Sequence, residues 1–181
     1  MQSKYIENHI NITKLIRILI LFLIIIFEIF KNKGFINFFK KHLKVCLCVI
    51  GKKENLYVKE FIDYYKKLGY NKIIIYDNND INDEKFEDII KKEIRKGFVS
   101  IINYRGYEGK NKHPQFDAYK DCYEKNNMKY NWLSFFDFDE FLELNPKSQT
   151  IREFLNHKRF QKCQTIKINW IVYKNIDSLY Y

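Results

Sequence analysis

Few features of this sequence favour a disordered or linker-rich chain. Its 181 residues include only two prolines and six glycines, and they contain no internal repeat and no low-complexity block. Hydrophobic residues make up 46% of the chain and aromatic residues 18%. That is enough apolar surface for one folded domain with a short additional segment.

The sequence also lacks the glycine-rich and cysteine motifs that would indicate common cofactors. Neither a G-x-G-x-x-G nor a Walker motif follows the first predicted strand, which disfavours a dinucleotide-dependent oxidoreductase and a P-loop NTPase. The four cysteines, Cys46, Cys48, Cys122 and Cys163, fit no zinc-binding spacing. We interpret them as buried thiols, which leaves the redox state of the compartment open.

Basic residues outnumber acidic ones, and the excess is concentrated near the N-terminus. The formal net charge is +10, and residues 1–44 hold eight Lys or Arg against two Glu. These charges flank an apolar segment that is uninterrupted from residue 18 to residue 27. Charge placed this way is typical of a membrane flank rather than of a nucleic-acid-binding face, so we expect no nucleic-acid partner.

The pattern divides the chain into four parts: an N-terminal tail (1–13), a membrane anchor helix (14–31), a basic juxtamembrane linker (32–42) and a folded domain (43–181). With Arg17 reaching toward one interface, the anchor is just long enough to cross a bilayer. No small-residue cleavage site follows it, which favours a single-pass, uncleaved signal anchor over a cleaved signal or an interfacial helix. Basic residues lie on both sides, so the sidedness of the domain is left open.

The folded domain alternates apolar runs with amphipathic segments. Strands are predicted at 45–50, 73–76, 98–102, 132–136 and 164–172, and helices at 56–68, 86–94, 115–123 and from 151 onward. Strands that alternate with helices of this length predict parallel βαβ units with right-handed crossovers. The expected fold class is therefore α/β, with a Rossmann-like and mostly parallel sheet preceded by the membrane helix.

Polar clusters follow three of the predicted strands, at residues 52–55, 77–80 and 137–140. In an open parallel sheet, ligands bind at the carboxyl ends of the strands. If strand geometry persists, Asp137 and Asp139 project to the same side, and two carboxylates suit a hard cation such as Mg²⁺ or Mn²⁺. Metal-assisted phosphoryl, nucleotidyl and glycosyl transfer all fit such a site. A solvated acidic loop is the alternative.

An ordered set of short motifs narrows this chemistry. It comprises Tyr57-x-x-Glu60-Phe61-Ile62-x-Tyr64, Leu68-Gly69, Ile75-Tyr76-Asp77-Asn78, Gln115-x-x-Ala118-Tyr119-x-Asp121-Cys122, Asp137-Phe138-Asp139-Glu140-Phe141 and Asn169-Trp170. With this set, the sequence resembles the family-92-like (DUF23-type) glycosyltransferases, relatives of the family-2 glycosyltransferases with the GT-A fold. The resemblance implies a GT-A sheet, a nucleotide-sugar donor (a UDP-sugar), a Mn²⁺ or Mg²⁺ ion, and transfer of a hexose to a glycan or other hydroxyl acceptor.

The resemblance also implies roles for individual residues. Asp137 and Asp139 become the DxD pair, with Asp139 as the direct metal ligand and Asp137 nearer the ribose or the metal. Asp77 would face the nucleoside, and Glu54 would help to close the same pocket. From the residues alone, Asp77 is equally a turn former. Glu54 has the alternative of a solvated charge at a helix start, and we interpret His113 as a surface residue rather than a ligand.

The catalytic residue is unassigned. An inverting transfer needs a carboxylate-type base near the acceptor hydroxyl. Glu140 is the candidate within the motif, with capping of the following turn as its alternative role. The sequence ends at Tyr181, and the resemblance implies a further metal ligand and a base beyond that point, so we expect an incomplete domain. A non-catalytic nucleotide-binding remnant and a metal-dependent nucleotidyltransferase or phosphotransferase are the alternative functions.

Overall fold

A computed structural model of the chain describes residues 19–24, 26–28, 43–145, 149–160 and 162–171. The chain separates into two units, residues 1–42 and 43–181. In the first unit, residues 19–24 and 26–28 are helical, and none of the described helices is both long and apolar enough to cross a membrane. The predicted tail, the predicted linker and much of the predicted anchor (14–31) lie outside the described residues.

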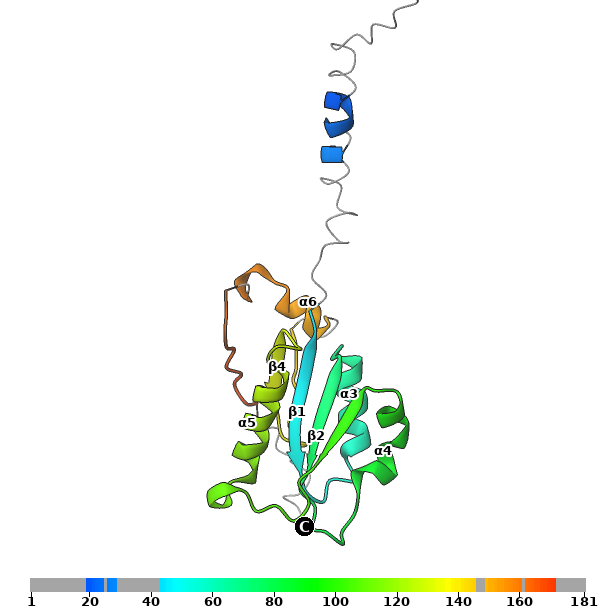
Figure 1. The fold of residues 1–181 in the computed structure, drawn as a ribbon, viewed down its shortest axis with the longest axis vertical. Helices are drawn as coiled ribbons and strands as arrows, with labels where there is room; N and C mark the ends of the chain where they lie inside the picture. Colours follow the sequence, from blue (N-terminus) through cyan, green and yellow to red (C-terminus); the bar gives the residue numbers. More distant parts are fainter. Residues whose placement is uncertain (1–18, 25, 29–42, 146–148, 161, 172–181) are drawn as a thin grey trace, which may run out of the picture. The chain divides into compact units, whose positions relative to one another are not determined.

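The second unit is built on a parallel sheet of four strands. Its strands lie side by side in Figure 1. The strands are β1 (Val45–Gly51), β2 (Lys72–Asp77), β3 (Val99–Asn103) and β4 (Trp132–Phe135), in the order β3-β2-β1-β4. Every neighbouring pair among them is parallel. The predicted α/β class with a Rossmann-like parallel sheet is therefore confirmed.

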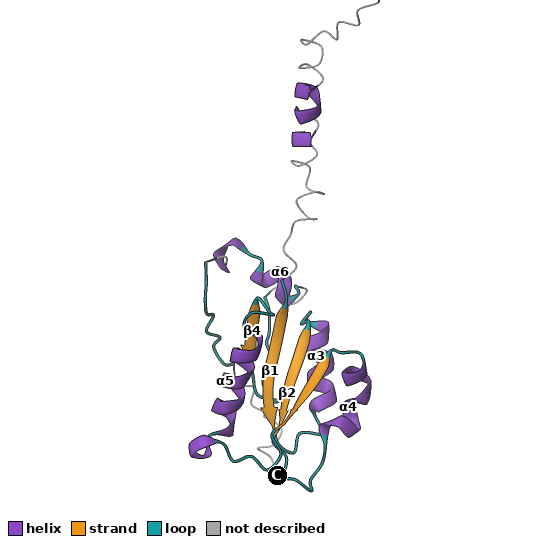
Figure 2. Cartoon of the chain, in the orientation of Figure 1, coloured by secondary structure: helices purple, strands orange, loops and turns teal. Residues whose placement is uncertain are grey.

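Helices cover both faces of this sheet (Figure 2). They are α3 (Val58–Lys67), α4 (Phe86–Arg95), α5 (Pro114–Asn126) and α6 (Ile151–Leu155), with short 3₁₀ turns at Lys110–Lys112 and Lys158–Phe160. The core on one face includes residues of α3, α4 and α6, and the core on the other face includes residues of α5. Alternate residues of β1 point to the two cores, which explains why its sequence is apolar without interruption.

The predicted last strand is wrong for residues 164–171, and Val172 lies outside the described residues. This stretch is irregular, and none of its backbone groups pairs with another strand within the described ranges. Ile166 packs against the core, but Trp170 is 82% exposed. The alternating apolar residues of segment 164–171 favour an extended conformation. An extended chain becomes a strand only when the edge of another strand accepts its hydrogen bonds.

The prediction of four buried thiols is wrong for three of the cysteines. Cys48 and Cys122 form a disulfide, and Cys163 is an exposed thiol. The two bonded residues are 74 positions apart in the sequence, but they meet because α5 packs across β1. Cys46 is the buried thiol that was expected, and burial raises its pKa to about 12.

The end of β1 is shaped by a close approach between Gly51 and Phe138. A Cβ atom on Gly51 would overlap the edge of the Phe138 ring. Phe138 is only 4% exposed, and its ring centroid lies 4.8 Å from that of Phe61 and 5.5 Å from that of Phe86. A ring held from several sides cannot move aside at low cost, so this position requires glycine for reasons of space.

We expect Gly51→Ala to lower the free energy of unfolding by about 1–3 kcal/mol, the usual cost of overpacking a core. In a Phe138→Leu background the same substitution should cost clearly less, because the smaller side chain frees the space. Urea denaturation of the four proteins of this cycle measures both costs. As a control, Gly97→Ala meets open space but has a φ of +75°, so its cost should not depend on residue 138. Equal costs of Gly51→Ala in both backgrounds would contradict the steric explanation.

Candidate functional site

The strand order places a topological switch point between β1 and β4. From β1 the chain builds outward through β2 and β3, and it then returns to the other side of β1 as β4. This return also changes the face on which the helices lie, from that of α3 and α4 to that of α5. Ligands of open parallel sheets bind at the carboxyl ends of strands at such a point. The loops that leave this point carry Glu54 after β1 and the Asp137–Glu140 segment after β4.

The Asp137–Glu140 segment is a turn closed by its own end residues. The Glu140 amide donates to the Asp137 carbonyl at 3.1 Å, and the Asp137 amide donates to Glu140 Oε2 at 3.0 Å. From α3, the Tyr65 hydroxyl donates to the Glu140 carbonyl at 2.8 Å and accepts from the Leu142 amide at 3.1 Å. Glu140 therefore occupies the turn-capping role that the sequence left open, and its catalytic role stays a prediction.

The Asp137 carboxylate is held from α5. Its Oδ1 accepts hydrogen bonds from Gln115 Nε2 at 2.7 Å and from the Tyr119 hydroxyl at 3.0 Å. Its Oδ2 accepts no hydrogen bond and forms no ion pair with the part of the chain that the structure describes. One oxygen of Asp137 is thus fixed by protein donors, and the other is available to a ligand.

Asp139 and Glu54 form the second half of the site. The Asp139 side chain is exposed, and within the described ranges it makes no hydrogen bond or ion pair. Glu54 is partly buried and lies close enough to Asp139 for their charges to interact. Burial is the largest cause that raises the pKa of Glu54 above its ordinary value, followed by the charges of Asp139 and Glu84. Two carboxylates that repel each other in this way favour a cation between or beside them.

Asp77 is built into the fold at the end of β2. It is 1% exposed, and its Oδ2 accepts from Arg105 Nη1 at 2.9 Å. Its Oδ1 accepts from the Asn79 amide at 3.0 Å and from Asn79 Nδ2 at 2.8 Å. Asp77 therefore fills the turn-forming role that was its alternative, and its predicted contact with a nucleoside stays a prediction.

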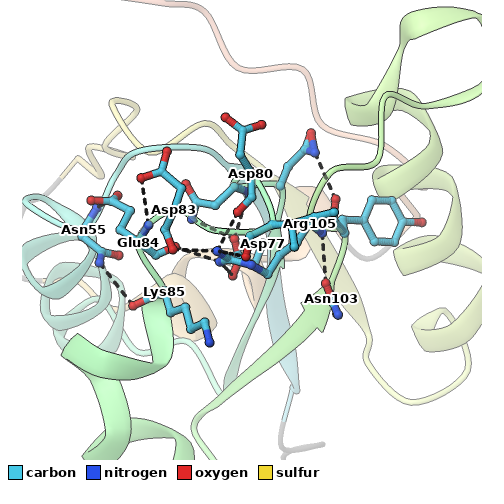
Figure 3. Close-up of polar contacts among 12 residues, drawn as sticks. Asn55, Asp77, Asp80, Asp83, Glu84, Lys85, Asn103 and Arg105 are labelled. Carbon is cyan, nitrogen blue, oxygen red and sulfur yellow. Dashed lines mark hydrogen bonds and ion pairs between the residues drawn. The ribbon is translucent and has the colours of Figure 1, made fainter.

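Arg105 fastens the loop after β2 to the loop after β3, as Figure 3 shows. Besides Asp77, its guanidinium donates to the carbonyls of Asp80 and Asp83 at 2.7 Å and of Glu84 at 2.8 Å. A charged donor with several fixed acceptors holds such a loop rigidly. The loop after β1 joins the same network, because the Lys53 amide donates to Asn79 Oδ1 at 2.7 Å.

The contacts of Arg105 and Tyr119 were not predicted from the sequence. Arg105 is one cation in a polar loop, and no spacing marks it. Tyr119 follows Gln115 by four positions on a helix, so both side chains lie on one face, and that spacing was a usable signal. His113, just before α5, is exposed and confirms its interpretation as a surface residue.

The donor chemistry of the site suits a hard divalent cation. Asp139 and Asp137 each present carboxylate oxygen that the described part of the chain leaves unbonded, and Mg²⁺ takes one or two carboxylates and completes its shell with water and phosphate. No group of three or more His, Cys, Asp or Glu side chains that could hold a metal occurs among the described residues. Two carboxylates suit an ion that takes its remaining oxygen ligands from water or from a phosphate group.

Comparison with known proteins points to one family. The family described as glycosyltransferase family 92 matches residues 41–177. A glycosyltransferase family 92 protein of Oryza sativa subsp. japonica is 25% identical over 118 residues, which are 65% of this chain and 19% of that protein. Galactan beta-1,4-galactosyltransferase GALS3 of Arabidopsis thaliana is 32% identical over 98 residues, which are 52% of this chain and 19% of that protein. The chain thus spans about a fifth of the length of these curated relatives. No solved structure matches it.

The raised pKa of Glu54 provides a test of the site's electrostatics. Asp139→Asn should lower the pKa of Glu54 toward its ordinary value, and Glu84→Gln should lower it less, following the order of the two charges. Carboxyl-carbon NMR titration measures the shift, with the exposed Asp88→Asn on α4 as the control that should leave it unchanged. Because folding raises this pKa, Glu54 should lower the stability of the fold as the pH rises through the interval above the ordinary value. A Glu54 titration that ignores Asp139 would show that the two side chains do not meet.

Proposed function

Because the chain belongs to glycosyltransferase family 92, we propose that it is part of a metal-dependent enzyme of the GT-A type. The reaction is transfer of a hexose from a nucleotide-sugar donor, a UDP-sugar, to a glycan or other hydroxyl acceptor. The observation that carries the proposal is the Asp139 carboxylate at the switch point, which makes no hydrogen bond or ion pair with the described residues and lies beside Glu54. Two positions earlier, Asp137 accepts hydrogen bonds from the described residues through Oδ1 alone.

Each carboxylate has a role in this proposal. Asp139 would hold Mn²⁺ or Mg²⁺, and Asp137 would bind the same ion or the ribose through its available Oδ2. When bound, the cation neutralises the charge that develops on the leaving diphosphate. Glu54 closes the pocket from the β1 side. Asp77 binds Arg105 and so holds the neighbouring loop after β2 in place.

The names of the relatives suggest the sugar to test first. Two of them, GALS3 and GALS2 of Arabidopsis thaliana, are named galactan beta-1,4-galactosyltransferases. We therefore propose galactose as the hexose and a galactan-type glycan as the acceptor, which makes UDP-galactose the donor of choice for assays.

Calorimetric titration of the full chain in detergent with UDP, with and without Mn²⁺, tests the proposed site. We expect binding that depends on Mn²⁺ and falls at least about 10-fold in Asp139→Ala, because a direct ligand to the metal is lost. Asp88→Ala removes another exposed carboxylate, on α4, and should bind as the wild type does. Metal-independent binding, or binding unchanged in Asp139→Ala, would overturn the site assignment. Tighter binding of nucleoside triphosphates than of UDP-galactose would favour nucleotidyl transfer instead.

We also propose that residues 14–31 anchor the chain in a membrane, supported by the apolar run from residue 18 to residue 27. The full chain should float with neutral phospholipid vesicles through a density gradient at high salt, whereas a chain that begins at Leu43 should stay at the bottom. High salt suppresses attraction of the basic flanks to the vesicle surface. Flotation of neither chain would remove the anchor from the proposal.

A further inference from the structure

The two hydrogen bonds that α5 donates to Asp137, here called the clamp, affect which metal ion the site can bind. Two donors, Gln115 Nε2 and the Tyr119 hydroxyl, converge on the same oxygen, Asp137 Oδ1. Ca²⁺ accepts bidentate carboxylates in a flexible shell of six to eight oxygens, whereas Mg²⁺ requires a near-ideal octahedron. Bidentate chelation through Asp137 would have to displace both donors from Oδ1. The clamp therefore favours an ion that needs only one oxygen from this residue.

Tyr119 is the firmer of the two donors. Its ring packs against Phe135 with centroids 5.1 Å apart, and its hydroxyl also lies 3.2 Å from the Phe136 carbonyl. The ring is fixed by packing and the hydroxyl by the end of β4, which together define where Asp137 Oδ1 must lie.

Gln115 is placed by the way in which α5 begins. Pro114 occupies the start of the helix, and the loop before it folds back so closely that a Cβ on Gly109 would overlap Pro114. In the first turn, Asp117 Oδ2 accepts from the Lys110 amide at 2.6 Å and from the Tyr107 hydroxyl at 2.8 Å. These contacts fix the first turn, so the exposed Gln115 side chain reaches Asp137 from a defined position.

We infer that Tyr119 and Gln115 are positioning residues that set the metal preference of the site, by holding Asp137 as a one-oxygen ligand and so favouring Mg²⁺ over Ca²⁺. This inference rests on the proposed function, since it presupposes a metal-dependent nucleotide site. It concerns neither the DxD pair itself nor the donor. It assigns a function to the face of α5 that carries Gln115 and Tyr119.

The test is titration of the full chain in detergent with UDP in the presence of Mg²⁺ or Ca²⁺. In Tyr119→Phe and in Gln115→Met, the Mg²⁺-dependent affinity for UDP should fall about 10-fold, the usual effect of removing a partner of a metal ligand. The Ca²⁺-dependent affinity should stay the same or rise, so that the ratio of the two affinities falls. Phenylalanine keeps the packing on Phe135, and methionine keeps the length of the glutamine side chain.

Tyr76→Phe is the matched control. The Tyr76 hydroxyl donates to Asp121 Oδ2 of α5 at 2.8 Å. This substitution therefore also removes a tyrosine–aspartate hydrogen bond, but one in which Asp137 takes no part. It should lower the melting temperature and leave the ratio of affinities unchanged. An unchanged ratio in both Tyr119→Phe and Gln115→Met, or an equal change in Tyr76→Phe, overturns the inference and leaves the proposed function standing. Absence of metal-dependent UDP binding in the wild type overturns both.

Discussion

Burial of the Phe138 ring beneath the end of β1 determines where the neighbouring carboxylates can go. The ring packs against Phe61 of α3 and Phe86 of α4, and it lies so close to the backbone of β1 that only glycine fits at position 51. A charged residue cannot follow the ring into this core without a large desolvation cost. On one side of the ring Asp139 is exposed, and on the other Asp137 bonds to Gln115 and Tyr119 of α5.

The acidic residues at the carboxyl edge fall into two classes by what their oxygens bond to. Asp77 is buried, and both of its oxygens are bonded, to Arg105 and to Asn79. A carboxylate satisfied in this way stabilises the loops around it and has little left to offer a ligand. Asp139 is exposed and forms no bond with the described part of the chain, and Asp137 has one bonded oxygen and one unbonded oxygen. The sequence resemblance treats all three as site residues, whereas their hydrogen bonds differ: both oxygens of Asp77 are bonded, and Asp137 and Asp139 keep oxygens to which no described residue bonds.

Much of the sheet was predictable because a parallel strand buried on both faces must be apolar throughout. The runs at 45–50 and 73–76 obey this rule, and the observed β1 and β2 lie within one residue of them. A different pattern, alternation of apolar and polar residues, led to the wrong strand at 164–171, because alternation in the sequence does not supply an edge that can accept hydrogen bonds. The Cys48–Cys122 disulfide and the contacts of Arg105 were equally beyond prediction, since each joins segments that only the crossover brings together.

The reversal of strand order explains why the site draws on both faces of the sheet. In a sheet whose strands were added in one direction only, successive right-handed crossovers would put every helix on the same face. The return from β3 to β4 puts α5 on the face opposite α3 and α4. The carboxylate pair after β4 consequently meets Glu54 from the loop before α3 and Gln115 and Tyr119 from α5. One side supplies a repelling charge beside Asp139, and the other supplies neutral donors to Asp137. This asymmetry gives two aspartates that are two residues apart in the sequence different electrostatic surroundings.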